Sequence, residues 1–427
     1  MTTRTFLERL FDIAVAATHP ATCLVQHLPP APKTGRLFIL AAGKAAGSMT
    51  EVAEGHYLNA GFPLERMKGI AVARHGYGRP TRHIEMIEAG HPVPDDSSLA
   101  AAAKSLALAD DANANDIVLA LMSGGASANW IAPADGLALA EKQAVTRALL
   151  RSGAGIGEIN TVRKHLSRIK GGRLARHAQP ARLLTLAISD VPGDDPDTIG
   201  SGPTVPDRST LADARAIVAR YKLDLPEAVH RALADPKNES PKPGDPAFAN
   251  TEFKLVARPT DSFDAARKAV TDSGYECVFL GERVEGEARD VANAHAALAR
   301  DLKAQGKRAV ILSGGELTVT IRGKGNGGPN QEYALALAVA LDGETGIAAL
   351  AGDTDGTDGG RGSADDPAGA YVDGTSAGRA RARGLDPVAS LADNDSTEFF
   401  AQIGDLLNPG PTFTNVNDFR AIVVDRS

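Results

Sequence analysis

From residue 36 onward the sequence repeats one pattern, a short apolar run followed by a longer segment rich in Ala and Leu with charges three and four positions apart. The apolar runs of the first half are RLFILAAG, GIAVARHG, DIVLALMSGG and RLLTLAISD. Runs that are apolar throughout are typical of strands buried on both faces, and helices must then cover both faces of their sheet. The pattern therefore predicts an α/β fold with a mostly parallel sheet.

The pattern lapses between residues 234 and 250, where ADPKNESPKPGDPAFAN has the composition of a linker or a long surface connection. A second alternation follows, with predicted strands in FKLVARP, YECVFLG, RAVILSGG and GIAALAGD. At 427 residues the chain exceeds what one hydrophobic core usually supports. We therefore predict two domains, residues 1–240 and residues 250–427.

Two helices can be assigned from spacing alone. In TFLERLFDIAVAATHP the charges of Glu8, Arg9 and Asp12 break the apolar run, so this segment is predicted to be an amphipathic helix and not a signal peptide. The run SSLAAAAKSLALADDA predicts a second helix, with Ser97 or Ser98 as its N-cap.

The composition favours a small ligand. A formal net charge of −7 repels nucleic acid and anionic lipid unless a local basic patch reverses the field. The only cysteines, Cys23 and Cys277, form no CxxC pair, which indicates neither a zinc site nor a disulfide framework and suits a reducing cytoplasm. No stretch approaches the roughly 18 uncharged apolar residues that a membrane span needs. We expect a cytoplasmic protein with neither nucleic acid nor membrane as partner.

Several predicted strands end in small or acidic residues, as in LAAGK, LMSGGAS, AISDVPGDD and LSGGE. In open α/β sheets ligands bind outside the carboxyl ends of the strands. SGGAS (123–127) and SGGE (313–316) offer hydroxyls and backbone N–H groups for a phosphate or carboxylate, although each alone also fits a tight turn. Lys44 follows a strand directly and could neutralise phosphate oxygens, or it could be a solvated lysine.

The segment AGDTDGTDGG crowds Asp353, Asp355 and Asp358 onto a loop at the end of a predicted buried strand. With Asp190 and the neighbouring Asp194 and Asp195, these carboxylates are ligands that could hold Mg²⁺, or one of them could act as a base. The spacing fails the EF-hand template. The alternative is that these aspartates only form turns.

Two further motifs remain ambiguous from the sequence. RGKGNGGPNQE matches GxGxxG, but the preceding LTVTIR alternates like a half-exposed strand, so a glycine-rich hairpin over a nucleotide fits as well as a dinucleotide turn. NTVRKHLSRIKGGRLARHA reads as a basic helix pair with Ile159, Val162, Leu166 and Ile169 on one face. Its charges are either a solvated face or a field that attracts a small anion.

In combination, several segments resemble the class II glycerate 2-kinases, whose members are often labelled hydroxypyruvate reductases and end in a MOFRL-type domain. The matching stretches are AAGKAAGSM, AGHPVPDDSS, LMSGGASANW, INTVRKHLSRIKGGRLA, AISDVPGDDPDTIGSGPTVPD, LSGGELTVTIRGKGNGGPNQEYALALA, AGDTDGTDG and PTFTNVNDFRAIVV. The resemblance implies a Rossmann-like amino-terminal domain, a second, smaller α/β domain with a mixed sheet, and an active site in the cleft between them. It also implies transfer of a phosphoryl group from ATP, with Mg²⁺, to the 2-hydroxyl of D-glycerate.

The resemblance maps the family's essential lysine onto Lys44 and its acidic positions onto Asp190, Asp353 and Asp355. It departs where many members carry arginine after the glycine pair, because this chain has Pro329 there. Arg322 or Arg163 would then have to supply the cation.

We therefore predict the following site. The catalytic residues are Lys44, Asp190, Asp353 and Arg322; the substrate-binding residues are Lys44, Arg163 and Asp190; the metal ligands are Asp190, Asp353 and Asp355. The nucleotide-binding residues are Gly43, Ser123, Gly124, Gly125, Ser127, Ser313, Gly314, Gly315, Glu316, Gly325, Gly328 and Asn330. Phosphoryl transfer needs positioned cations, a held metal and a group that orients the hydroxyl. We expect a monomer or homodimer; an NAD(P)H-dependent hydroxypyruvate reductase and a non-catalytic sensor are the alternatives.

Overall fold

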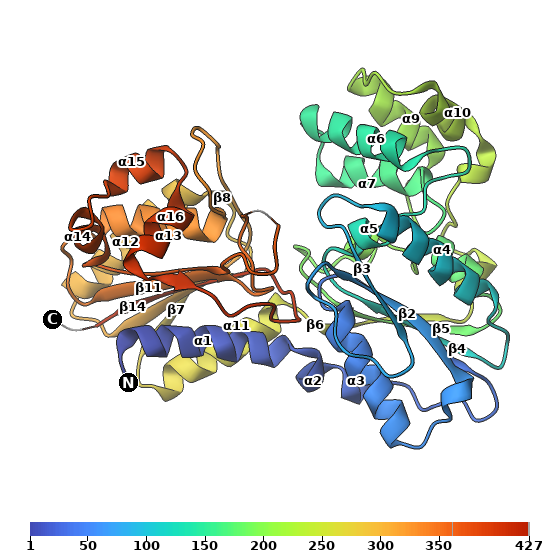
Figure 1. Ribbon diagram of the computed structural model, residues 1–427, viewed down its shortest axis with the longest axis horizontal. Coiled ribbons are helices and arrows are strands. Elements are labelled where there is room, and N and C mark those ends of the chain that lie inside the picture. The colour runs from blue at the N-terminus through green and yellow to red at the C-terminus, as the bar shows by residue number, and fades with distance from the viewer. Residues whose placement is uncertain (361, 426–427) are drawn as a thin grey trace. The chain divides into compact units, whose positions relative to one another are not determined.

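The computed structural model describes residues 1–360 and 362–425, and it divides into two compact units. The N-terminal unit is Cys23–Val256, and the C-terminal unit combines Met1–Thr22 with Ala257–Ser427. Each unit has its own six-stranded sheet with helices packed against it (Figure 1). The predicted α/β class is therefore confirmed. Among the described residues, no helix is both long enough and apolar enough to cross a membrane.

The sheet of the N-terminal unit has the strand order β3-β2-β1-β4-β5-β6. Its strands are β1 (Leu37–Ala42), β2 (Met67–Arg74), β3 (Glu85–Ala89), β4 (Ile117–Met122), β5 (Arg182–Ile188) and β6 (Thr251–Ala257). The pairs β1–β2, β1–β4, β2–β3 and β4–β5 are parallel. Every residue of β1 and β4 is buried, which explains why these strands read as continuous apolar runs.

The helices of the N-terminal unit form two groups. They are α3 (Ala46–Asn59), α4 (Asp96–Asp110), α5 (Ala126–Asn129), α6 (Leu139–Arg151), α7 (Ile156–His165), α8 (Arg173–His177), α9 (Leu211–Arg220) and α10 (Glu227–Ala234). Helices α3, α4, α5 and α8 pack at the sheet, whereas α6, α7, α9 and α10 share a core of their own and lie together in Figure 1. The predicted apolar face of the basic helix pair is buried, with Ile159, Val162 and Leu166 in that second core.

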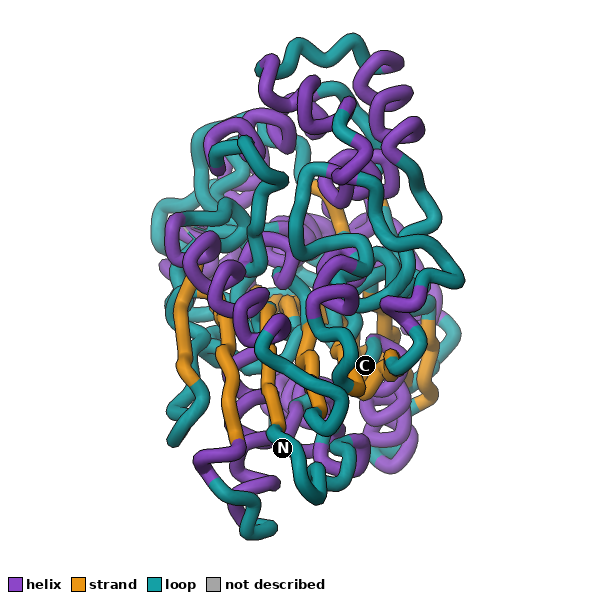
Figure 2. Tube along the Cα trace, turned by 90° about the vertical axis from the view of Figure 1, so that its right-hand side faces the viewer, coloured by secondary structure: helices purple, strands orange, loops and turns teal. Residues whose placement is uncertain are grey.

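The sheet of the C-terminal unit is mixed, with the order β13-β12-β11-β14-β9-β7. Its strands are β7 (Glu276–Phe279), β9 (Ala309–Gly314), β11 (Ile347–Asp353), β12 (Gly369–Asp373), β13 (Leu406–Leu407) and β14 (Asp418–Val424), and β8 (Gly286–Glu287) pairs separately with β10 (Leu317–Thr318). Strand β14 runs antiparallel to both of its neighbours, β9 and β11. Figure 2, in which strands are orange, shows several strands of the molecule lying side by side.

Alternate residues of this second sheet face two different helix layers. Its helices are α1 (Thr3–Thr18), α2 (Pro20–Cys23), α11 (Pro259–Asp272), α12 (Ala288–Ala304), α13 (Pro329–Ala340), α14 (Ser376–Arg381), α15 (Pro387–Ala392) and α16 (Ser396–Ile403), with α2 at the join to the other unit. Ile311 and Ile422 pack with α12 and α13, whereas Leu312 and Ala421 pack with α1 and α11. The unit is thus a three-layer sandwich of helices, sheet and helices.

The N-terminal unit covers residues 23–256, so it both begins and ends later in the chain than the predicted domain of residues 1–240. Helix α1 belongs to the C-terminal unit because Phe6, Leu10 and Phe11 share a core with Phe263 of α11. The expected linker at 234–250 packs within the N-terminal unit, since Arg173 donates to the Asn238 carbonyl and Ser240 donates to Asp207.

Three local predictions require correction. The segment FKLVARP, assigned to the second domain, contributes β6 to the first sheet. The segment LTVTIR forms only the two-residue strand β10. The N-cap of α4 is Asp95 and not Ser97 or Ser98, because the Asp95 carboxylate accepts from the Ser98 N–H while the Ser98 hydroxyl accepts from the Asp95 N–H in a capping box.

Candidate functional site

In the N-terminal unit, the loops after β1 and β4 interlock at the carboxyl edge of the sheet. The Lys44 N–H donates to the Gly124 carbonyl over 2.8 Å, and the Ala45 N–H donates to the Ser123 hydroxyl over 2.9 Å. Gly43 has a φ of 120°, and a Cβ atom there would lie 2.3 Å from the Ser123 Oγ. The predicted residues Gly43, Lys44, Ser123 and Gly124 are therefore in direct contact, and all but Lys44 are buried. Only glycine at position 43 permits this close packing.

Two side chains flank the end of this surface. Gly125 has a φ of 85°, and a Cβ atom there would lie 3.1 Å from the His91 Nε2 and 3.4 Å from the Lys44 Cγ. His91 was given no role in the sequence analysis, although it stands in the quoted stretch AGHPVPDDSS. His91 and Lys44 are far apart in the sequence, so no local pattern predicts that they lie close together. Only the presence of His91 in AGHPVPDDSS, a stretch that carries the family resemblance, pointed to this residue.

Asp190 follows β5 at the same edge, because β1, β4 and β5 are adjacent and parallel. Two other acidic residues of this loop, Asp195 and Asp197, have roles in the local structure. Asp195 accepts from the Asp197 N–H in a turn, and Asp197 forms an ion pair with Lys164. Burial raises the pKa of Asp197. Asp190 is the acidic residue of this loop that lies nearest to the end of β5 in the sequence.

Ser127 lies on α5 and connects the SGG loop to the basic helix pair. Its hydroxyl is 2.8 Å from the Ser201 hydroxyl, and the Ser201 hydroxyl donates over 3.4 Å to the Asn160 amide oxygen. The Lys170 ammonium donates to the Ser127 carbonyl over 2.7 Å. The basic segment therefore reaches the predicted anion loop.

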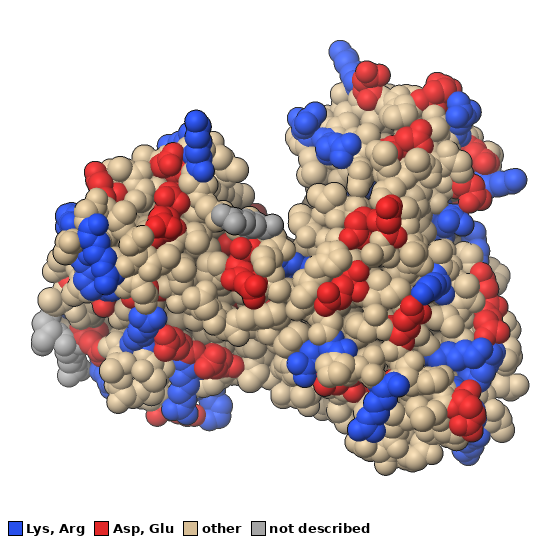
Figure 3. Space-filling view, viewed as in Figure 1, with Lys and Arg blue, Asp and Glu red and all other residues tan. Residues whose placement is uncertain are grey.

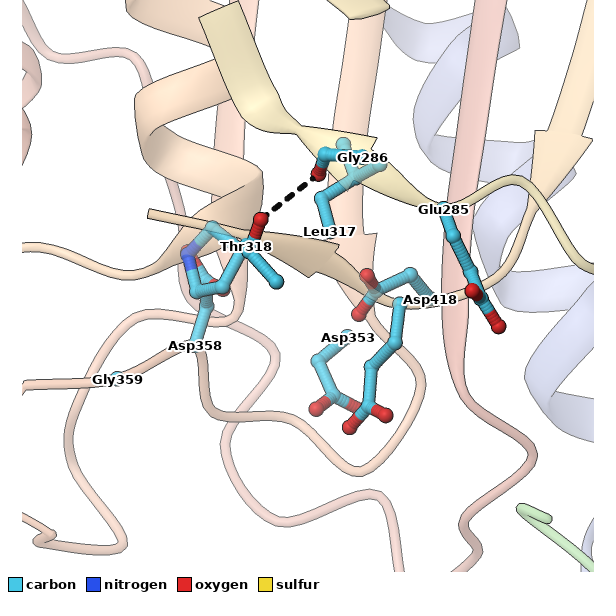
Figure 4. Close-up of a pocket in the computed structure, with 10 residues that line it drawn as sticks. Glu285, Gly286, Leu317, Thr318, Asp353, Asp358, Gly359 and Asp418 are labelled. Carbon is cyan, nitrogen blue, oxygen red and sulfur yellow. Dashed lines mark hydrogen bonds between the residues drawn. The ribbon is translucent and has the colours of Figure 1, made fainter. Parts of the chain in front are cut away.

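In the C-terminal unit, the acidic residues lie around a cavity of about 450 Å³ (Figure 4). Its lining residues are Glu285, Gly286, Glu316, Leu317, Thr318, Pro329, Asp353, Asp358, Gly359 and Asp418. Asp353 ends β11 and Asp418 begins β14, where the two residues pair directly in register. Asp418 had no role in the sequence analysis because it precedes its strand, whereas the predicted ligands were sought after strands.

The three aspartates of the AGDTDGTDGG loop have different surroundings. Asp353 lines the cavity. Asp355 is buried, and its carboxylate accepts from the Thr357 N–H over 2.7 Å in a turn. Asp358 is also buried and accepts from the N–H groups of Asn330 and Gln331, over 3.0 and 2.8 Å, at the start of α13.

Asp358 and Asp418 are crowded. Burial and the neighbouring Asp418 raise the pKa of Asp358 to about 7. Burial also raises the pKa of Asp418, although Arg420 acts against it. The Asn330 amide donates to both carboxylates, over 3.2 Å to Asp358 and 2.7 Å to Asp418, so this predicted nucleotide-binding residue connects acidic groups. A divalent cation would relieve such crowding.

The glycines of RGKGNGGPNQE have packing reasons to be glycine. A Cβ atom at Gly323, Gly325 or Gly328 would lie 2.3 to 2.4 Å from Asp393, Asp395 or Asp358 respectively. The motif follows the short strand β10 and an irregular segment, so it lacks the strand, turn and helix of a dinucleotide fingerprint. Pro329 lines the cavity as the first residue of α13, a position that suits proline. The Arg322 side chain is exposed and does not line the cavity.

Within residues 1–360 and 362–425, no group of three or more His, Cys, Asp or Glu side chains could hold a metal ion by itself. Of the predicted metal ligands, Asp353 and Asp355 belong to the C-terminal unit and Asp190 to the N-terminal unit. Mg²⁺ in phosphate-transfer sites is commonly held by one or two carboxylates, water and the substrate's phosphates. The residues present fit that mode and not a preformed metal cage.

The two edges differ in their charged side chains, with cations on one beside Asp190 and a cluster of carboxylates on the other. Lys44, Arg163 and Lys170 belong to the N-terminal unit, whereas Asp353, Asp358 and Asp418 belong to the C-terminal unit. Elsewhere, the face shown in Figure 3 carries basic and acidic side chains intermixed. The charge separation is therefore local to the loops at the ends of the strands.

Known proteins match this chain along nearly its whole length. Residues 6–234 match DUF4147, a domain of unknown function, and residues 309–418 match the MOFRL family. A protein of Agrobacterium vitis, provisionally named hydroxypyruvate reductase, is 48% identical over 427 residues, covering 99% of this chain and 94% of its own. The D-glycerate 2-kinase of Thermotoga maritima is 39% identical over 410 residues, covering 95% and 94%.

A solved structure agrees with the sequence matches. The crystal structure of a glycerate kinase from Thermotoga maritima superimposes with a TM-score of 0.86 at 37% sequence identity, covering 99% of each chain. Both the sequence and the fold of this protein are therefore shared with that enzyme from end to end.

Proposed function

This chain belongs to the glycerate kinase family, and we propose that it transfers the γ-phosphoryl group of ATP to the 2-hydroxyl of D-glycerate, giving 2-phospho-D-glycerate. The resemblance drawn from the motifs is thereby confirmed at the level of the family. The observation that carries the proposal is the presence of a lysine at one strand edge and a carboxylate pair at the other, with Lys44 beside the Ser123–Gly125 loop and Asp353 beside Asp418.

The N-terminal unit would bind anionic groups. Lys44 supplies a point charge beside a loop whose glycines let an oxygen approach the backbone closely. Asp190, at the same edge, could accept the proton of the attacking hydroxyl or help to hold the metal, and so could Asp353. Arg322 is exposed. In its predicted catalytic role, its side chain would have to reach the substrate from the surface of the protein.

The C-terminal unit would hold the metal. Asp353 and Asp418 face one cavity, and Asp355 orders the loop that follows β11 through its turn with Thr357. When bound, Mg²⁺ would neutralise charge on the phosphate oxygens of ATP. The protein's own contribution is to fix the carboxylates, and the register pair between β11 and β14 does so from two neighbouring strands. The active site in a cleft between the domains stays a prediction.

The test is product identification. Purified protein with ATP, Mg²⁺ and D-glycerate should give a product that enolase converts directly, without phosphoglycerate mutase, and phosphorus NMR should assign its phosphate to carbon 2. A 3-phosphoglycerate product would overturn the regiochemistry and leave a glycerate kinase. Oxidation of NADH or NADPH with hydroxypyruvate, without any need for ATP, would instead establish the reductase, for which the glycine-rich motif offers no dinucleotide turn.

A further inference from the structure

Lys142, Arg163 and Lys170 of the N-terminal unit form no ion pair with a carboxylate of the described residues, although each is at least partly buried. Lys142 is 2% exposed and Lys170 is fully buried. Their ammonium groups donate only to backbone carbonyls, Lys142 to those of Arg163 and Leu166 and Lys170 to that of Ser127. Burying cations without counter-ions is costly, so a fold that retains three of them together needs a reason beyond packing.

Two neighbouring residues, Lys164 and His165, do have acidic partners, whereas the buried Arg173 donates only to backbone carbonyls. Lys164 forms ion pairs with Asp197 and Asp207, and His165 lies 3.1 Å from a Glu239 carboxylate oxygen. Residues with and without an acidic partner lie in the same basic segment, where Lys164, His165 and Arg168 stand between Arg163 and Lys170. The excess charge therefore lies on the side where Arg163 and Lys170 stand, and no described carboxylate pairs with it there.

Helix α7 directs Arg163 toward the anion loop. Arg163 follows Asn160 by three residues, so both lie on the same face of the helix. Asn160 is hydrogen-bonded to Ser201, and Ser201 to Ser127, whose carbonyl accepts from Lys170. The Arg163 Nε is buried and has no hydrogen-bond partner, while the residue as a whole is partly exposed. An unsatisfied guanidinium thus stands beside the segment that carries the SGG loop.

We propose, on the premise that this protein phosphorylates a hydroxy acid, that Arg163 binds the carboxylate of that substrate, with Lys170 and Lys142 supplying positive charge behind it. A guanidinium presents paired N–H donors that match the two oxygens of a carboxylate. Lys44 lies beside Gly125, and the Lys170 ammonium donates to the Ser127 carbonyl. In this proposal the segment Gly125–Ser127 therefore lies next to both anions. The phosphate is held near its start and the carboxylate near its end.

Electrostatics supports this assignment. Burial lowers the pKa of Arg163, and burial together with the neighbouring cations lowers the pKa values of Lys142 and Lys170 well below their ordinary values. An anion bound among these groups would favour their charged forms again. The cluster is therefore better suited to an anionic ligand than to solvent.

Calorimetric titration without ATP or Mg²⁺ tests the proposal independently of catalysis. The titrants are D-glycerate and its neutral amide, D-glyceramide. Wild-type protein should bind the carboxylate more tightly than the amide. Arg163→Gln should weaken D-glycerate binding about ten- to a hundredfold, down to the affinity for the amide, and Arg163→Lys should recover part of the loss. Arg147→Gln, at an exposed position of α6, is the matched control and should bind like wild type.

The outcomes separate the two proposals. Carboxylate-dependent binding that Arg163→Gln abolishes, without formation of any phosphoglycerate by wild type, would support the carboxylate site and remove the kinase assignment. Wild-type affinity for D-glycerate in a folded Arg163→Gln variant would overturn the carboxylate site, as would a wild-type protein that binds neither titrant. Loss of ATP affinity in place of D-glycerate affinity would overturn it too, because Arg163 would then serve the nucleotide. Circular dichroism establishes that each variant is folded.

Discussion

The tripeptide Ser-Gly-Gly occurs at the carboxyl end of a buried strand in each unit, and its two copies make different contacts. After β4, Ser123 accepts from the Ala45 N–H, and Gly125 leads into α5 beside Lys44 and His91. After β9, Ser313 and Gly314 still belong to the strand, and the Arg420 guanidinium donates to the carbonyls of Gly314 and Gly315 over 2.6 and 2.8 Å.

The difference teaches that the surroundings, and not the tripeptide, decide what such a loop offers. The first loop lies beside Lys44 and His91, and we propose that it binds anionic groups. The second has two carbonyls committed to a buried arginine, which also pairs with Asp418 over 3.0 Å. A Cβ atom at Gly315 would lie 2.3 Å from the Val284 backbone nitrogen, so this glycine allows close packing. The second loop borders the acidic cavity, to which it contributes Glu316 as a lining residue.

Removing Lys44 should give the largest effect on catalysis. We expect Lys44→Ala to lower kcat/KM for D-glycerate phosphorylation about a thousandfold, because one preorganised charge at the phosphates is lost. The thermal midpoint should change little, since Lys44 lies on a loop. Steady-state kinetics with a coupled ADP assay measure this, with the exposed Lys33→Ala as control. Near-normal turnover in Lys44→Ala would show that the first loop does not bind the reacting phosphates.

Removing Arg420 should give the largest effect on stability and so mark the second loop as structural. Arg420 is 1% exposed, and Arg420→Met leaves the buried Asp418 without its cation. We expect a loss of about 3 kcal/mol in the free energy of unfolding. Urea titration measures the change, and Arg300→Met, which breaks a surface pair with Glu344, is the control with a loss below about 1 kcal/mol. Equal midpoints for the two variants would refute the contrast between the loops.

Asp353→Asn should weaken metal use. We expect kcat/KM to fall about a hundredfold and the Mg²⁺ concentration for half-maximal activity to rise, because one carboxylate ligand becomes a neutral amide. The readout is activity as a function of Mg²⁺ concentration. Asp365→Asn, on an exposed turn of the same unit, should behave like wild type. An unchanged Mg²⁺ dependence would mean that the acidic cavity is not the metal site.

The smallest expected effect is a pH dependence. The pKa of Asp358 is raised to about 7, whereas an unfolded aspartate titrates near its ordinary value of about 4. Between these values the folded protein holds a proton that the unfolded chain has released, so the stability contributed by Asp358 declines as pH rises from 4 to 7.

Asp358→Asn removes this titration. The free energy of unfolding of wild type minus that of the variant should therefore decrease by about 2 to 3 kcal/mol between pH 5 and pH 8. The histidines titrate in both proteins, so their contribution to the pH dependence cancels in this difference. His295 is one of them, and burial lowers its pKa to about 4. Denaturant unfolding in metal-free buffer measures it, and a difference that is constant with pH would contradict the raised pKa.

Much of the fold could be predicted because its signals are local. Strands β1, β4, β5, β9 and β11 are apolar runs of the length that a doubly covered sheet requires. Strand β3 was missed because EMIEA at the sheet's edge is mostly exposed and has no such run. The glycines at 323, 325 and 328 matched a nucleotide motif by spacing, yet their closest neighbours are Asp393, Asp395 and Asp358 from distant segments.

By itself, the sequence determined that the chain would form parallel α/β layers and that Lys44, Asp190 and Asp353 would stand where strands end, because hydrophobic periodicity acts over a few residues. Only the tertiary structure decided which polar groups meet. Asp418 joins Asp353 because β14 runs antiparallel between β9 and β11, and Lys170 reaches Ser127 because a separate helical core carries the basic segment back to the sheet. Such contacts depend on strand order and on packing between distant segments, which no local pattern encodes.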